Sequence, residues 1–254
     1  MFYPLDRGGE AARVYRGLKD VLPGDMALHF FGMAAPEMEI VPVAHRNTQG
    51  FMIALVSVNS EREMEEAAAT VCAGLEPTVK NVASVPYVEL QSMFDVFNPW
   101  GVHAYEKGLF LAEMNDEVIA GIVKHMPRKS AKLSYLTVFA YGGAYAEKDD
   151  MDTAWGGRRD AGYQLVVGGL GLTAEELAPD RQWVRDFWQD LQPFAMGTGS
   201  YINNMNEYEE HRVRDAYGPK KYRKLQELKD RYDPENLFHH NQNITPLGAQ
   251  SVRV

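Results

Sequence analysis

A tyrosine and several asparagines near the end of the chain are the side chains most able to do chemistry. The stretch GTGSYINNM carries Tyr201 and Asn203 two positions apart, and HHNQNITP carries Asn241 and Asn243. If the first stretch is a short strand, the phenol and the carboxamide share one face, because side chains repeat with period two, and Asn204 points the other way. Glycines just before the tyrosine let the backbone approach a planar partner closely. The spacing therefore predicts that one ligand meets both side chains.

Several helices are expected to position these residues. Apolar side chains at spacings of three and four predict a helix over 9–21 and further helices in the stretches SEREMEEAAATVCAGL, EMNDEVIAGIVKHMP and TAEELAPDRQWVRDFWQDLQPF, the last in two pieces. Ser60 with a glutamate three residues later is a capping box, and Asn115 (or the aspartate after it) and Thr173 are expected N-caps. The aromatic side chains of the last stretch are expected in the core.

Strands are expected between the helices, at 27–33, 39–45, 51–58 and within AKLSYLTVFAYGGA and AGYQLVVGGLG. A run of strands with helices inserted between some of them favours an α+β fold, with a largely antiparallel sheet and helices packed on one face. A change of composition near residues 195–200 leads into a polar, helical tail. We expect an α+β domain over 1–198 and a separate segment over 199–254, in which two helices flank the sequence YGP.

The composition argues against several classes of protein. The 254 residues carry a formal net charge of −9, whereas general nucleic-acid binding needs a basic surface. The longest apolar run, near 51–58, is far shorter than the roughly 20 residues of a membrane helix, and no signal peptide is visible. Cys72 is the only cysteine and is expected to be buried. His239 and His240 are adjacent and point apart, so no metal site is expected. We expect a cytoplasmic protein without nucleic-acid or membrane partners.

The sequence of the tail resembles that of a known protein family. The pattern YIN…AYG…Y.KL.ELKDRYDPENLF..NQNI.P over about 199–246 resembles the C-terminal segment of the berberine-bridge-enzyme-like FAD-linked oxidases. Three earlier stretches, MFYPLDRGGEAARVYRGL, VPYVELQSMFD and TAWGGRRDAGYQLVV, resemble parts of that family's substrate domain. Gly157 stands where the family often has histidine, so any role of that histidine is missing here.

The resemblance implies roles for particular residues. Tyr201 matches the family's catalytic base near the flavin, and Asn203 matches a residue that contacts the flavin. Asn241 is the implied cofactor contact of the terminal segment, with Asn243 close behind. Because a free tyrosine has a pKa of about 10, such a base needs a neighbouring cation or donor. On family grounds Arg158 is that neighbour and a substrate contact.

The substrate site implied by the resemblance also includes Tyr87 and Gln91. The family's flavin domain holds the pyrophosphate of FAD on a glycine-rich loop. The nearest such sequence here, the Gly-Gly-Leu-Gly run at 168–171, is short and falls in the substrate domain. The family's GGGHS-like stretch with its flavin-linked histidine is not in this sequence. We therefore expect an incomplete FAD site whose flavin domain is absent from this chain.

Two functional hypotheses remain open from the sequence. The first is the C-terminal part of an FAD-dependent oxidase of a small organic alcohol, sugar or natural product, completed by a flavin domain, a partner chain or a homo-oligomer. The second is a non-catalytic α+β module, derived from such an oxidase, that binds a small ligand or self-associates.

Overall fold

A computed structural model describes residues 1–207 and 209–248, and the described part contains six strands and seven α-helices. The expected α+β class is confirmed. The strands are β1 (Phe2–Pro4), β2 (Ala27–Ala34), β3 (Gln49–Val56), β4 (His103–Leu111), β5 (Tyr135–Ala140) and β6 (Tyr163–Gly171). The helices are α1 (Gly8–Leu18), α2 (Glu61–Gly74), α3 (Tyr87–Ser92), α4 (Asp116–His125), α5 (Gly143–Glu147), α6 (Ala174–Leu191) and α7 (Glu210–Tyr232).

All six strands form one sheet in the order β1-β3-β2-β5-β6-β4, and every neighbouring pair is antiparallel. The first three strands lie within the first 56 residues, and the other three lie between residues 103 and 171. The two halves join where β2 pairs with β5, in a register that runs from His29 opposite Phe139 to Gly32 opposite Leu136. We call this junction the β2–β5 seam.

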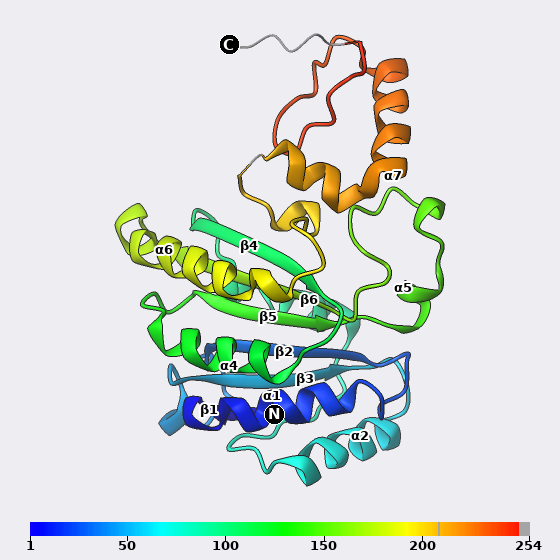
Figure 1. The fold of residues 1–254 in the computed structure, drawn as a ribbon. Helices are drawn as coiled ribbons and strands as arrows, with labels where there is room; N and C mark the ends of the chain where they lie inside the picture. The colour runs from blue at the N-terminus through cyan, green and yellow to red at the C-terminus, as the bar shows by residue number, and fades with distance from the viewer. Residues whose placement is uncertain (208, 249–254) are drawn as a thin grey trace.

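The long helices α1, α4 and α6 cover one face of this sheet (Figure 1). Because strand side chains alternate between faces, Phe30, Leu136, Val138, Leu165 and Val167 all enter the core beneath these helices. The side chains between them point to the opposite face, which the long helices leave uncovered. That helix-free face carries most of the polar side chains of the central strands and both cavities described below.

Local signals in the sequence set the starts of three helices as expected. The Ser60 hydroxyl accepts a hydrogen bond from the Glu63 N–H and the Glu63 carboxylate accepts one from the Ser60 N–H, which confirms the capping box. Asn115 and Thr173 cap α4 and α6 through their side chains, as predicted. Trp183 and Phe187 of α6 are buried, as expected for core residues.

Two expected elements were wrong, and one strand was missed. Residues 39–45 form no strand: they hold bends and a short 3₁₀ turn, Val43–His45. The edge strand β4 was missed, because Glu106 and Lys107 interrupt its apolar pattern. Helix α6 runs unbroken through Pro179, since buried residues lie along one face of the helix on both sides of the proline. Cys72 is only partly buried.

The tail folds into two helical pieces, as predicted. Within α7, Gly218 has φ 70° and ψ 159°, a conformation that glycine adopts readily, and Pro219 starts the second piece. The buried Lys221 ammonium donates to the Asp150 carboxylate at 2.7 Å and to the Trp155 carbonyl at 2.8 Å, which ties α7 to the loop around α5 (Figure 1). None of the helices in the described ranges has the length and apolar character to cross a bilayer.

A buried carboxylate fastens the start of β5 to helix α6. Asp180 is 1% exposed. It accepts hydrogen bonds from the Ser130 N–H at 2.8 Å, the Ser130 hydroxyl at 2.7 Å and the Ala131 N–H at 2.9 Å, and also from the Ser134 hydroxyl. Ser134 immediately precedes β5, so this carboxylate sets where the strand begins.

Lys129 beside this carboxylate predicts a pH dependence of stability. Burial lowers the pKa of its ammonium from 10.5 to about 8, although Asp180 acts in the opposite direction. Between pH 8 and 10.5 the unfolded chain binds more protons than the folded chain. The free energy of unfolding should therefore rise by up to about 3 kcal/mol as the pH is raised from 8 to 10.5.

Chemical denaturation of the wild type and of Lys129→Met, at intervals between pH 7.5 and 10.5, checks this expectation. Tyrosine ionisation contributes equally to both proteins, so the difference between the two curves isolates the lysine. Parallel curves across the window would contradict the prediction.

Candidate functional site

The helix-free face carries a cavity of about 310 Å³ over strands β5 and β6. It is lined by Tyr135, Thr137, Phe139, Tyr141, Trp155, Gln164, Val166, Tyr201 and Asn204. The strands supply alternate residues, the loop after α5 supplies the tryptophan, and the start of the tail supplies the last two. Residues more than 60 positions apart in the chain thus meet around one hollow, which we call the Tyr201 cavity.

Tyr201 lies at this cavity between an aromatic ring and a carboxamide. Its ring stacks on Trp155, with 4.3 Å between centroids and 19° between planes, and its hydroxyl accepts a hydrogen bond from Asn203 Nδ2 at 2.8 Å. The two tail residues therefore contact each other, but only Tyr201 lines the cavity, and a ligand shared by both stays a prediction. The predicted strand was wrong: Ile202–Asn204 is a 3₁₀ turn in which the Asn204 N–H donates to the Tyr201 carbonyl at 2.9 Å.

The same turn overturns the expectation for Asn204, which points into the cavity rather than away from it. Its Oδ1 accepts from Gln164 Nε2 at 3.0 Å, and its Nδ2 donates to Glu106 Oε2 at 3.2 Å. Asn203, by contrast, is exposed. In a 3₁₀ turn the side chains do not alternate as they do in a strand, so the period-two argument does not fix which asparagine faces inward.

The Gln164 and Asn204 carboxamides belong to a chain of hydrogen bonds across three strands. The Tyr141 hydroxyl donates to Gln164 Oε1, and at the other end the Tyr135 hydroxyl donates to Glu106 Oε1 at 2.6 Å. Burial raises the pKa of both phenols, and Glu106 raises that of Tyr135 further, so both phenols are protonated donors at neutral pH. Sequence reasoning missed these strand residues, although a glutamine inside the apolar run AGYQLVV was a usable signal.

The closing asparagine segment lies beside the Tyr201 turn. The Gln242 amide donates to the carbonyl of Met205, and Ile244 packs against the cluster that contains Met205. Asn241 is exposed with φ 58°, while Asn243 has its Oδ1 buried without a hydrogen-bond partner in the described residues. The two ends of the tail therefore meet.

The three predicted substrate contacts do not line this cavity. The Arg158 guanidinium pairs with Asp160 at 2.8 Å and donates to the Met196 carbonyl at 3.4 Å. Tyr87 and Gln91, on the short helix α3, are both exposed, the tyrosine by 73%. Their predicted roles would need a ligand or a further protein surface over α3.

The glycines of the Gly-Gly-Leu-Gly run are packed against protein. A Cβ on Gly168 would lie 2.5 Å from the Tyr135 ring, and one on Gly171 would lie 2.6 Å from a backbone nitrogen of α6. These glycines make room for neighbouring elements, so the run forms no open cradle for a phosphate.

Gly157 makes room for the tryptophan that stacks on Tyr201. A Cβ at position 157 would lie 2.5 Å from Trp155 Nε1 and 3.0 Å from the Phe110 ring. We expect Gly157→Ala to displace the indole, to weaken the stack and to lower the free energy of unfolding by about 1–3 kcal/mol. Urea denaturation followed by tryptophan fluorescence measures both effects.

Gly17→Ala is the matched control for that substitution. Gly17 lies in α1 with no atom within 4 Å of its added Cβ, so alanine should be neutral or stabilising there, by up to about 1 kcal/mol. Equal changes in the free energy of unfolding for the two variants would show that the close contacts of the added Cβ at position 157 do not destabilise the fold.

Comparison with known proteins finds sequence similarity to FAD-linked oxidoreductases. The family model "Berberine and berberine like" matches residues 200–245. An FAD-linked oxidoreductase of Dictyostelium discoideum is 28% identical over 172 residues, which are 67% of this chain and 37% of that protein. The (R)-6-hydroxynicotine oxidase of Paenarthrobacter nicotinovorans is 44% identical over 48 residues, which are 19% of this chain and 10% of that enzyme.

Solved structures extend the likeness to the fold. A berberine bridge enzyme variant described as a reticuline dehydrogenase matches with a TM-score of 0.77 at 13% identity, over 97% of this chain and 54% of that chain. The chain thus spans about half the length of that structure and little more than a third of the Dictyostelium relative. Over its tail the chain is similar in sequence to the berberine-like family model, and over nearly its whole length it shares a fold with solved berberine-bridge-enzyme-like proteins.

Proposed function

We propose that this chain forms the substrate-facing wall of an FAD-dependent oxidoreductase that oxidises an alcohol or amine carbon of a small organic molecule. The observation that carries the proposal is the Tyr201 cavity. There a phenol held by a carboxamide faces a hydrogen-bonded row of polar side chains on the open face of the sheet. In a protein of this family, such a hollow suits a ligand placed between the sheet and a flavin.

The residues around the cavity fit the ring system of a flavin. The stacked Trp155 and Tyr201 rings present flat apolar surface next to amide groups. Asn243, in the closing segment beside the turn, has a buried Oδ1 without a hydrogen-bond partner in the described residues, but it does not line the cavity.

The same residues do not fit the phosphates of FAD. The glycine run at 168–171 is filled by its neighbours, so its N–H groups cannot converge on an anion. We therefore propose that a flavin domain outside the described residues, on the same polypeptide or on a partner chain, holds the pyrophosphate.

Tyr201 would act as the proton acceptor in this site. When bound, the flavin supplies the hydride acceptor for the carbon that is oxidised. Asn203 Nδ2 donates to the tyrosine oxygen and so holds in place the atom that would accept the substrate proton. The row from Tyr141 to Glu106 would orient the substrate, because its donors and acceptors are fixed on rigid strands.

Exposed apolar side chains support the presence of a covering protein surface. In the tail, Leu237 is 69% and Phe238 82% exposed, and Trp100 is fully exposed in the loop after α3. Large apolar side chains of this kind often mark interaction surfaces. A flavin domain or a second copy of the chain would cover them.

Absorbance between about 350 and 500 nm tests the proposal. The chain alone, and the chain mixed with a flavin-domain protein of a related oxidase, are incubated with FAD and freed of unbound cofactor. We expect little colour from the chain alone and a yellow complex from the mixture that bleaches with a substrate alcohol in the absence of oxygen. A flavin domain that gains no cofactor or activity from the chain would contradict the proposal.

The second candidate, a non-catalytic module that binds a small ligand or self-associates, is favoured by the same exposed side chains. Light scattering distinguishes the two proposed functions. A stable homo-oligomer that leaves the flavin-domain protein unbound would favour the module.

A further inference from the structure

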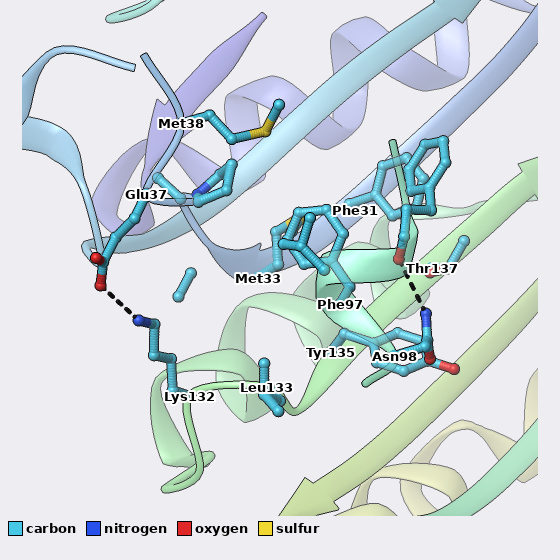
Figure 2. A pocket seen from close by; sticks show the side chains of 15 residues that line it. Phe31, Met33, Glu37, Met38, Phe97, Asn98, Lys132, Leu133, Tyr135 and Thr137 are labelled. Carbon is cyan, nitrogen blue, oxygen red and sulfur yellow. Dashed lines mark hydrogen bonds and ion pairs between the residues drawn. The ribbon is translucent and has the colours of Figure 1, made fainter. Parts of the chain in front are cut away.

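A second cavity, of about 400 Å³, lies beside the Tyr201 cavity on the helix-free face and straddles the β2–β5 seam (Figure 2). Its floor includes Phe31 and Met33 from β2, and Phe94 and Phe97 come from the segment after α3, with Leu133 at another wall. We call this hollow the apolar cavity. Its volume and composition are those of small-molecule sites, which are mostly apolar with few polar groups.

The charged groups of the apolar cavity neutralise each other. Glu37 and Lys132 form an ion pair at 2.8 Å, and Asn47 Nδ2 also donates to the Glu37 carboxylate at 2.7 Å. Figure 2 shows this pair on the side opposite Tyr135 and Thr137. A carboxylate that is already paired offers little to a cationic amine, and the neutral polar side chains of the lining, such as Asn98 and Thr137, are too few for a sugar's many hydroxyls. The lining therefore suits an uncharged apolar ligand.

The two cavities share a border. Tyr135 and Thr137 of β5 line both of them, with the apolar cavity extending over β2 and the Tyr201 cavity over β6. Since neighbouring strands lie about 5 Å apart, a molecule that reaches from β2 to β6 is about 10 Å long. That length corresponds to two or more fused rings.

We propose that the substrate is an uncharged molecule with an apolar fused-ring body, which lies in the apolar cavity while its oxidisable carbon reaches the Tyr201 cavity. The assignment of the reacting end rests on the proposed function, whereas the binding of the ring body does not need the flavin. Phe97 and Met33 hold the rings, and Thr137 marks the passage between the cavities. The proposal selects an apolar natural product over a sugar or a charged amine.

Calorimetric titration of the chain with 2-naphthol, phenol and glucose tests this proposal. We expect saturable binding of 2-naphthol, at least tenfold weaker binding of phenol, which lacks the second ring, and no binding of glucose. Leu133→Trp should fill the apolar cavity and weaken 2-naphthol binding at least tenfold. Val123→Trp on α4, on the far side of the sheet, should leave the affinity within twofold.

Phe97→Ala provides a second variant should the filled protein fail to fold. It removes one wall and should also weaken 2-naphthol binding at least tenfold, with an unchanged circular dichroism spectrum. Equal affinities for the three probes, no binding of 2-naphthol, or binding unchanged in a folded Leu133→Trp or Phe97→Ala would overturn the proposal. The titrations contain no flavin, so they test ligand binding separately from the oxidoreductase function. If 2-naphthol binds as expected but the chain forms no yellow complex with the flavin-domain protein, the oxidoreductase function is overturned and the proposed ligand class is retained.

Discussion

Replacing Asp180 by alanine should lower the free energy of unfolding by about 3–5 kcal/mol, the largest stability effect we expect from one side chain. The carboxylate is buried and accepts hydrogen bonds from backbone N–H groups of Ser130 and Ala131 and from two serine hydroxyls. Alanine removes the acceptor of the buried Ser134 hydroxyl and of the part-buried donors of Ser130 and Ala131, and each unsatisfied buried group costs about 1–3 kcal/mol. Thermal denaturation should show a midpoint lower by about 10 °C.

Asp186→Ala on the same helix is the matched control. Its carboxylate is partly exposed and bonds only to solvent-exposed side chains, Arg128 and Gln182, so its loss should cost less than about 1 kcal/mol. Similar destabilisation by the two alanine variants would mean that the buried carboxylate contributes no more than a surface one.

Tyr201→Phe should lower the turnover of the flavin-loaded assembly by about 10²–10⁴-fold, the usual contribution of a general base. Phenylalanine can keep the stack on Trp155 while it removes the hydroxyl that accepts from Asn203. Anaerobic single-turnover flavin reduction measures the chemical step directly. Substrate affinity should change far less than the rate of reduction.

Tyr217→Phe controls for the loss of a phenol hydroxyl near the site. Tyr217 is half-buried on α7 and does not line the Tyr201 cavity, so flavin reduction should keep its wild-type rate. A Tyr201→Phe enzyme that reduces flavin as fast as wild type would show that another group accepts the proton.

The elements most predictable from the sequence are those set by local chemistry. Ser60 with Glu63, Asn115 and Thr173 each determine a helix start within a few residues, and Gly218 with Pro219 places the break in α7. Such signals act over one or two helical turns, which is why they can be read without knowing the fold.

The site was predictable only in part, because its other half comes from distant strands. The structure brings Tyr201 into contact with Asn203 and puts Gln242 of the closing segment beside their turn, whereas the roles of these residues toward a flavin stay predictions. The partners of Asn204, however, are Gln164 and Glu106, which lie 40 and 98 residues away. These residues come together because of the strand order β5-β6-β4 in the sheet, and no local sequence pattern predicts that order.

The β2–β5 seam has a consequence for how the protein assembles. Each half of the sheet can form from its own stretch of chain, but the seam pairs residues more than 100 positions apart, which makes docking of the halves a candidate for a slow step in folding. The floor of the apolar cavity comes from both sides of the seam. A compound that occupies it binds the docked state alone and shifts the docking equilibrium by mass action, acting as a pharmacological chaperone for this chain.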